Sequence, residues 1–272
     1  MNKEERIQQF KRIGIITLWC VLLIGLVVSL AFVQHEQKSV TCKEVDIRIS
    51  PEKDNFFVDR QMVISILTNE GAEKDLIGKP IGRFDVAQLE SKLERNPFIY
   101  NAEVYAGING ELKVDVYQRR PVLRVMKEDG SGYYIDNRGF KMPLSDLYTA
   151  HIVIATGNIP ENYGTNDSLR TPITQELYKL AEFLEQHEFW KAQVDQIYVN
   201  EKNDLVLIPK IGDHTIVLGT TEGIEDKMNR LMAFYTEALN KMGWDQYSSI
   251  NLKYEGQIVC TKKNQPNTYE QQ

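Results

Sequence analysis

Residues 96–121 read NPFIYNAEVYAGINGELKVDVYQRRP. Apolar side chains occupy every second position on either side of an Asn-Gly pair at 109–110; they are Ala102, Val104, Ala106, Leu112, Val114 and Val116. Alternation with this period is typical of half-buried strands, and an Asn-Gly pair favours the tight turn between two antiparallel strands. The pattern therefore predicts a β-hairpin.

The segment before the hairpin predicts one more strand and two helices. Residues 40–49 alternate in part, as a half-buried strand does. Asp59 can cap a helix over residues 60–69, and Asp85 can cap a second helix that the Asn-Pro pair at 96–97 ends. The order strand, helix, helix, strand, strand predicts a small α+β module whose two helices cover one face of the sheet.

Residues 121–260 predict a second domain, a mixed β-sheet with two helices. One helix is expected after Thr171-Pro172 and the other over residues 224–239, because apolar residues recur there at helical spacing. Strands are expected at 133–136, 151–155, 194–199, 205–208, 215–218, 250–254 and 257–260. The polar residues 157–169 predict a loop, and residues 261–272 a flexible tail.

An uncharged run from Ile13 to Val33 predicts a transmembrane helix. At about 1.5 Å per residue the run reaches ~31 Å, close to the thickness of the hydrocarbon core, and a helix satisfies its own backbone hydrogen bonds. We expect Ile13, Trp19 and Val33 to mark the membrane anchor. The alternatives are a buried core helix and a signal peptide cleaved near Ser29-Leu30-Ala31, although the run is longer than the apolar part of most signals.

The flanking charges predict the orientation of this helix. Lys3, Arg6, Lys11 and Arg12 precede it, whereas Lys38 is the only base in residues 34–42. The positive-inside rule therefore places residues 1–12 in the cytoplasm and the rest of the chain, from residue 34, outside. We expect a single-pass protein of the cell inner (plasma) membrane.

Length and composition indicate a folded chain of about two domains. Apolar residues make up 42% and charged residues 26% of the 272, which excludes disordered, collagen-like and disulfide-knot classes. The net charge is −6, and beyond residue 33 the chain has 28 basic and 36 acidic side chains. A surface of this sign repels phosphate backbones, so we expect no nucleic-acid partner.

The sequence contains no motif for a cofactor, a metal or a nucleophile, and we expect no cofactor, no metal site, no catalytic residue and no enzymatic activity. The four histidines are scattered, and no Cys-x-x-Cys, glycine-rich phosphate loop or GxSxG elbow occurs. Cys20 falls in the predicted span, while Cys42 and Cys260 lie outside, where disulfides persist. A bridge between these two cysteines stays open at this point.

Several segments resemble the FtsQ (DivIB) family of bacterial cell-division proteins. FFVD at 56–59, NPFIYNAEV at 96–104 and LKVDV at 112–116 resemble the POTRA domain of that family. YYIDNRG at 133–139 and INLKY at 250–254 resemble its β domain. The family has Glu-Arg-x-Pro where this chain has Gln118, and often Asp-Leu-Arg-Tyr where it has Asn251 and Lys253. The resemblance covers about residues 1–260.

The resemblance implies a non-enzymatic scaffold of the division machinery, anchored in the membrane at the septum. Such a protein binds FtsB and FtsL-like partners through the edge strand of its outer β domain and helps regulate septal peptidoglycan synthesis. A last strand also leaves N–H and C=O groups that a partner strand can meet. The expected partner-binding residues are Leu252, Tyr254, Gly256 and Val259, with Tyr254 as anchor. Because side chains alternate along a strand, Leu252 or Val259 is alternatively a core residue.

Two other functions stay open from the sequence. The first is a cell-envelope hydrolase or transferase whose site is assembled only in the fold; a deep pocket with converging carboxylates or a Ser/His pair would favour it. The second is an outer-membrane assembly or secretion component built from POTRA modules. That function predicts repeated modules or a terminal barrel, and the sequence shows neither.

Overall fold

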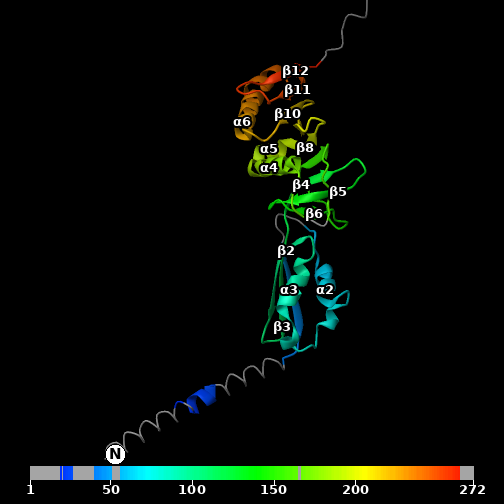
Figure 1. Cartoon of the computed structure of the whole chain (residues 1–272), viewed down its shortest axis with the longest axis vertical. Helices are drawn as coiled ribbons and strands as arrows, with labels where there is room; N and C mark the ends of the chain where they lie inside the picture. The colour runs from blue at the N-terminus through cyan, green and yellow to red at the C-terminus, as the bar shows by residue number, and fades with distance from the viewer. Residues whose placement is uncertain (1–18, 20, 27–39, 51–55, 165–166, 264–272) are drawn as a thin grey trace, which may run out of the picture. The chain divides into compact units, whose positions relative to one another are not determined.

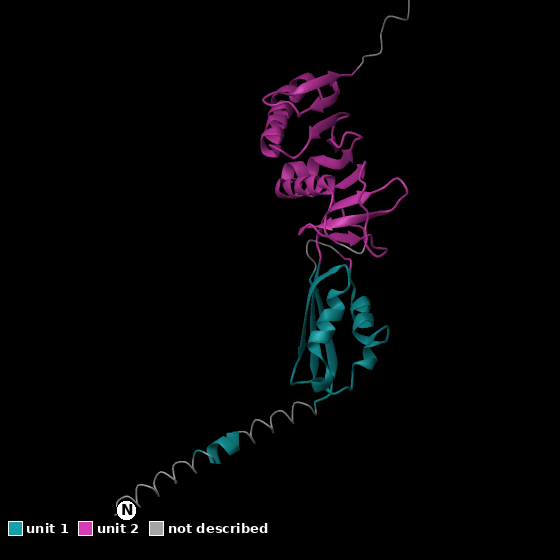
Figure 2. Cartoon of the chain, in the orientation of Figure 1, with its two compact units in different colours: residues 1–51, 58–118 teal, residues 52–57, 119–272 magenta. Residues whose placement is uncertain are grey.

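The computed structural model describes residues 19, 21–26, 40–50, 56–164 and 167–263 (Figure 1). The chain forms two compact units, coloured separately in Figure 2. Unit 1 comprises residues 1–51 and 58–118, and unit 2 comprises residues 52–57 and 119–272. Residues 52–57 therefore belong to unit 2, although unit 1 surrounds them in the sequence.

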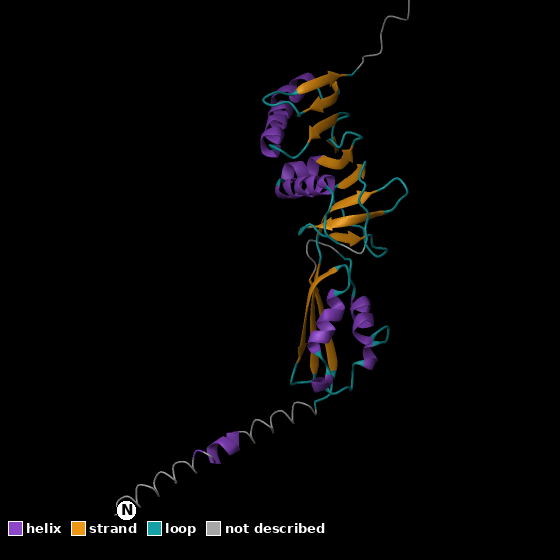
Figure 3. Cartoon of the chain, in the orientation of Figure 1, coloured by secondary structure: helices purple, strands orange, loops and turns teal. Residues whose placement is uncertain are grey.

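Unit 1 is a three-stranded sheet with two helices on one face (Figure 3). Its main elements are β1 Glu44–Ser50, α2 Arg60–Thr68, α3 Val86–Glu94, β2 Ile99–Ala106 and β3 Glu111–Gln118, with 3₁₀ turns at Glu73–Asp75 and Ile81–Arg83. The strand order is β1-β3-β2, with β1 parallel and β2 antiparallel to β3. The predicted strand-helix-helix-strand-strand order and the hairpin are confirmed.

Local hydrogen bonds account for the ends of these helices. Asp59 Oδ1 accepts a hydrogen bond from the Met62 N–H at 2.7 Å, and Asp85 Oδ1 accepts one from the Gln88 N–H at 3.1 Å. Each carboxylate satisfies a first-turn donor that has no partner within the helix. Gly110 adopts φ +93° in the hairpin turn, where a side chain would be strained.

Unit 2 is built on a nine-stranded mixed sheet in the order β12-β11-β10-β9-β8-β7-β4-β5-β6. The strands are β4 Pro121–Met126, β5 Gly132–Asp136, β6 Lys141–Pro143, β7 Ile154–Gly157, β8 Val194–Val199, β9 Leu205–Pro209, β10 Thr215–Gly219, β11 Tyr247–Asn251 and β12 Val259–Lys262. The helices are α4 Pro172–Gln186, α5 Glu188–Gln193, α6 Ile224–Phe234 and α7 Asn240–Met242, with a π-helical turn at Tyr235–Leu239. One continuous apolar core joins the helices to the sheet.

The structure corrects several predicted elements of unit 2. The strands β4 and β6 and the helix α5 were not predicted, so the expectation of only two helices was wrong. In β4, the neighbours Val122 and Leu123 are both buried in the same core, where the pairing with β5 is irregular between Pro121 and Leu123, so the strand lacks the alternation that marks a half-buried strand. The helix expected over residues 224–239 changes to π geometry after Phe234.

The predicted final hairpin is present but shifted. The strand expected at 250–254 ends at Asn251, and the strand expected at 257–260 is β12, which continues to Lys262. Leu252 to Ile258 form the connection between the two strands. β12 therefore includes residues 261 and 262, which the sequence assigned to the flexible tail.

Part of the predicted membrane span lies within the described residues. Trp19 and residues 21–26 are helical, and their large apolar side chains are exposed. Ile13 and Val33 fall outside the described residues, as do residues 1–12. Within the described part, no helix has both the length and the apolar character needed to cross a bilayer.

Two of the cysteines belong to the described residues. Cys42 is buried in unit 1 and Cys260 is partly buried in unit 2, and both are free thiols. The bridge that the sequence left open is therefore not formed. Burial raises the pKa of both thiols above the ordinary 9.0.

Candidate functional site

The two edges of the nine-stranded sheet differ in what covers them. At one edge, the Lys141 N–H of β6 donates to the Asp167 carbonyl at 2.6 Å, and Phe140 forms a bridge with Ser168. At the other edge, no strand among the described residues pairs with the outer side of β12. An uncovered edge strand presents backbone donors and acceptors to a partner strand, so β12 is the candidate docking edge.

The register of the last hairpin decides which side chains reach the surface. Ile250 lies opposite Cys260, and Asn251 lies opposite Val259. Ile250 is fully buried and Cys260 packs partly against the core, whereas Val259 is 43% exposed. Because side chains alternate, Val259 and Thr261 share the exposed face of β12.

The four predicted partner-binding residues of this hairpin differ in burial: one is in the core and three are at the surface. Leu252 is fully buried in the core, and its N–H donates to the Val217 carbonyl at 2.9 Å. The core alternative therefore holds for Leu252, which cannot touch a partner in the folded state. Tyr254 and Gly256 lie in the connecting loop, where Tyr254 is 51% exposed and Gly256 has φ +67°. Tyr254, Gly256 and Val259 remain available at the surface of this hairpin.

Arg230 of α6 fixes the loop that carries Tyr254. Its Nη1 donates to the carbonyls of Tyr254 and Gln257 at 2.9 and 2.6 Å, and its Nε donates to Asp226 at 3.0 Å. Lys253 holds the other side of the loop through an ion pair with Asp204 at 2.8 Å. Arg230 was not among the residues expected from the sequence, where its only local signal is its spacing from Asp226.

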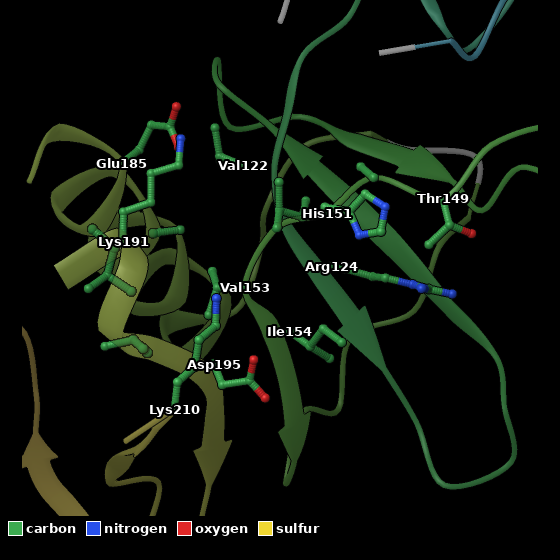
Figure 4. A pocket seen from close by; sticks show the side chains of 15 residues that line it. Val122, Arg124, Thr149, His151, Val153, Ile154, Glu185, Lys191, Asp195 and Lys210 are labelled. Carbon is green, nitrogen blue, oxygen red and sulfur yellow. The ribbon is translucent and has the colours of Figure 1, made fainter. Parts of the chain in front are cut away.

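A second candidate site is a pocket of about 310 Å³ in unit 2 (Figure 4). Glu185, Asp195 and His151 are among its lining residues. The Glu185 carboxylate pairs with Arg120 at 2.9 Å and with Lys191 at 2.7 Å, so it is held by two cations. The described lining offers no Ser/His pair. The pocket therefore does not favour the hydrolase or transferase alternative.

The described residues also contain no group of three His, Cys, Asp or Glu side chains placed to hold a metal ion. His214, the most buried of the described histidines, instead shares a hydrogen bond with the Tyr235 hydroxyl at 2.9 Å. Desolvation lowers the pKa of His214 below the ordinary 6.5. It packs with Tyr235 and Trp244 in an aromatic cluster beside the π-helical turn.

Fold and edge together define a class, a protein with a POTRA-like domain followed by a mixed-sheet domain that ends in an uncovered strand. Residues 40–117 match the POTRA-like domain family, and residues 120–261 match the family described as FtsQ/DivIB, C-terminal related. The chain belongs to the FtsQ/DivIB family. It is similar to the cell division protein FtsQ of Rhodothermus marinus, 23% identical over 195 residues that cover 70% of either chain.

Membership confirms the resemblance seen in the sequence and gives the chain a role in cell division. Proteins of this family are scaffolds of the division machinery rather than enzymes. The geometry of unit 2 is the basis for proposing which surface binds a partner and what that partner is.

Proposed function

We propose that this protein is a non-enzymatic, membrane-anchored scaffold of cell division that binds partners by adding their strand to β12. The observation that carries the proposal is the difference between the two edges of the sheet. β6 is covered by residues 167–168, whereas β12 is uncovered within the described residues. Added strands gain affinity from main-chain hydrogen bonds and specificity from alternate side chains.

Tyr254 and Val259 are the proposed contact side chains beside this edge. A half-exposed tyrosine buries its ring against a partner and keeps its hydroxyl in water, which makes it a strong anchor. Gly256 contributes through its positive φ, which lets the loop turn toward β12. The proposed partners are FtsB- and FtsL-like division proteins, and the proposed consequence is regulation of septal peptidoglycan synthesis.

The proposal also places residues 13–33 in the inner membrane and the two units outside. Its support is the uncharged run in the sequence and the exposed apolar side chains of residues 21–26. Apolar side chains exposed along a helix gain free energy on transfer to lipid. The proposed domains are the cytoplasmic tail 1–12, the span 13–33, the POTRA-like domain 34–120, the β domain 121–260 and the tail 261–272.

The test is to measure binding of an FtsB-like peptide to the full chain in detergent. Tyr254→Glu places a charge on the proposed anchor, so we expect the dissociation constant to rise about thirtyfold, as for a central interface residue. Tyr198→Glu is the matched control, because Tyr198 is an exposed tyrosine on β8 inside the same sheet. Equal affinity of wild type and Tyr254→Glu would show that the partner does not bind at the β12 edge beside Tyr254.

Strand addition makes a second, independent prediction. Only every second residue of an added strand directs its N–H toward the edge. Peptides N-methylated at one alternate set of positions should lose binding, while peptides methylated at the other set should keep it. Equal tolerance of both sets would show that the partner does not bind as a strand.

A further inference from the structure

We propose that protonation of His214 loosens the C-terminal end of β12, so that this histidine acts as a pH-sensitive switch in unit 2. The inference concerns the order of the last hairpin and goes beyond the docking function proposed above, on which it does not depend. His214 lies directly before β10, and Trp244 and the π-helical turn that begins at Tyr235 pack against its ring.

The ring of His214 occupies a site that suits only the neutral imidazole. The residue is 4% exposed, and its Nε2 shares a hydrogen bond with the Tyr235 hydroxyl at 2.9 Å. Its Nδ1 is buried and has no hydrogen-bond partner among the described residues. An imidazolium donates from both nitrogens, so protonation would leave a charged N–H buried without an acceptor, which costs more than an unmatched neutral group.

The residues around the ring keep an acceptor away from Nδ1. Gly212 has φ +94° and lies against this edge of the ring, where a Cβ atom would be 2.7 Å from Nδ1. A side chain at position 212 would therefore collide with the ring instead of accepting its hydrogen. The Trp244 ring packs with its centroid 6.3 Å from that of His214, and an indole offers a donor but no acceptor.

The titratable groups that face His214 also disfavour its protonation on balance. Desolvation by burial is the largest cause that lowers the pKa of His214 below 6.5, and the Lys263 ammonium lowers it further, while Asp213 raises it. The π-helical turn presents Tyr235, which stays neutral because burial raises the pKa of its hydroxyl. The segment before β11 presents Trp244, which does not titrate. His214 is therefore neutral in the closed structure at neutral pH.

Lys263 connects this site to the end of β12. Its ammonium pairs with Asp213 at 2.8 Å, and its N–H donates to the Gln246 carbonyl at 3.1 Å. Asp213 directly precedes His214, and Gln246 follows Trp244 by two positions. An imidazolium that moves toward solvent disturbs both contacts, and it attracts the Asp213 carboxylate that otherwise pairs with Lys263. Protonation therefore loosens β12 where the strand ends.

Acidification should favour an open conformation in which the His214 ring reaches water. In that conformation the pKa of His214 returns to 6.5, whereas in the closed one it is lower. Above pH 6.5 both conformations are neutral and the opening equilibrium is constant. Below pH 6.5 the open one binds more protons, so opening becomes up to about tenfold more frequent per pH unit. Asp213 stays ionised in this window, because Lys263 lowers the pKa of its carboxyl below 3.8.

The experiment follows amide hydrogen exchange of the full chain in detergent at pH 7.5 and 5.5, with each rate divided by that of an unstructured peptide at the same pH. In wild type, we expect protection in residues 246–249 and 259–263 to fall about three- to tenfold at pH 5.5, within the range that linkage allows for one histidine. β4, which is distant from β12 in the sheet order, should keep its protection.

A variant then tests whether His214 is the titrating group. His214→Gln does not titrate, and its side-chain oxygen still accepts from the Tyr235 hydroxyl. We expect its protection in residues 246–249 and 259–263 to be the same at both pH values. His151→Gln replaces an exposed histidine of unit 2, so it should respond to pH as wild type does.

Equal protection of wild type at the two pH values would overturn the proposal, and so would an equal fall in His214→Gln. A fall confined to residues 211–215 would also overturn it, since His214 would then open without β12. The wild-type comparison decides the matter even if His214→Gln lowers the unfolding midpoint. None of these outcomes requires a bound partner, so a failure here is distinct from a failure of the docking proposal.

Discussion

Glu161 is the centre of a buried polar network in unit 2. It pairs with Lys141 at 3.0 Å, and both side chains are almost fully buried. Its carboxylate also accepts hydrogen bonds from the Thr174 hydroxyl, the Thr171 N–H and hydroxyl, and the Arg170 N–H. The network ties the loop before α4 to the start of that helix.

This network predicts a dependence of stability on pH. Burial alone would raise the pKa of Glu161, but hydrogen bonds from Thr174, Thr171, Lys141 and Arg170 outweigh it and lower the pKa from 4.5 to about 2. A pKa lowered by folding contributes stability that is fully present above pH 4.5 and is lost as the pH falls toward 2. Part of the unfolding free energy of unit 2 should therefore disappear in that window.

Glu161→Gln should lower the unfolding free energy at pH 7 by about 3–5 kcal/mol, since it leaves Lys141 as a buried unpaired cation. The unfolding free energies of wild type and Glu161→Gln, plotted against pH, should converge as the pH approaches 2. Urea unfolding followed by Trp190 and Trp244 fluorescence reports on unit 2. Glu188→Gln, at an exposed position, is the control. If the unfolding free energies of wild type and Glu161→Gln changed in parallel with pH, ionised Glu161 would not be the source of the pH dependence.

Gln118 explains one departure from the family pattern. It is buried at the end of β3, and its Oε1 accepts a hydrogen bond from the Val58 N–H at 2.9 Å. A neutral amide makes this contact without burying a charge. Gln118→Leu should leave the Val58 N–H unmatched and lower the unfolding free energy of unit 1 by about 1–3 kcal/mol, measured by hydrogen exchange of the β3 amides. Unchanged protection there would mean that the contact contributes nothing.

At the scale of elements, α6 acts on the last hairpin through Arg230. Its two hydrogen bonds to the Tyr254 and Gln257 carbonyls hold the loop in one conformation. A loop ordered before binding loses less entropy when a partner docks. Arg230 is thus the positioning residue for Tyr254 in the proposed site.

Arg230→Met should release the loop, because it removes the guanidinium while keeping an unbranched aliphatic side chain at this position of α6. We expect amide hydrogen exchange in residues 252–258 to rise about tenfold or more, with little change in β10. Asp226→Asn is the matched control, because it weakens one contact of Arg230 and leaves both loop contacts in place. Equal exchange in wild type and Arg230→Met would show that other contacts order the loop.

At the scale of the whole molecule, the proposed topology joins a short cytoplasmic tail to two outer units. A reporter enzyme that is active only outside the cytoplasm should be active when it is fused after residue 263, and a reporter that is active only in the cytoplasm should be inactive there. The chain should also remain in the membrane fraction after extraction at alkaline pH. Moving the four bases of residues 1–12 to residues 34–42 should invert the orientation in a fraction of molecules. A chain released by alkali, or shortened by cleavage near Ala31, would contradict the anchor.

Much of the architecture was readable from the sequence because it depends on neighbours in the chain. The period of two around Asn109-Gly110 predicted the hairpin, and Asp59, Asp85 and Thr171 predicted helix starts that the structure confirms. Caps and tight turns form between residues two to four positions apart, so their hydrogen bonds are fixed locally. Three of the motifs that resemble the family, at 56–59, 96–104 and 112–116, lie at one of these helix starts or on this hairpin.

The tertiary structure alone decided which surfaces are free. Leu252 and Tyr254 are two positions apart in a pattern that reads as one strand, yet the strand ends at Asn251, and only Tyr254 reaches solvent. Arg230 meets a loop more than twenty positions away, and the pocket combines residues from 122 to 210. Such contacts depend on how distant elements pack and which edge of a sheet remains uncovered. No local pattern encodes that information, because it arises only when the strands take their order in the sheet.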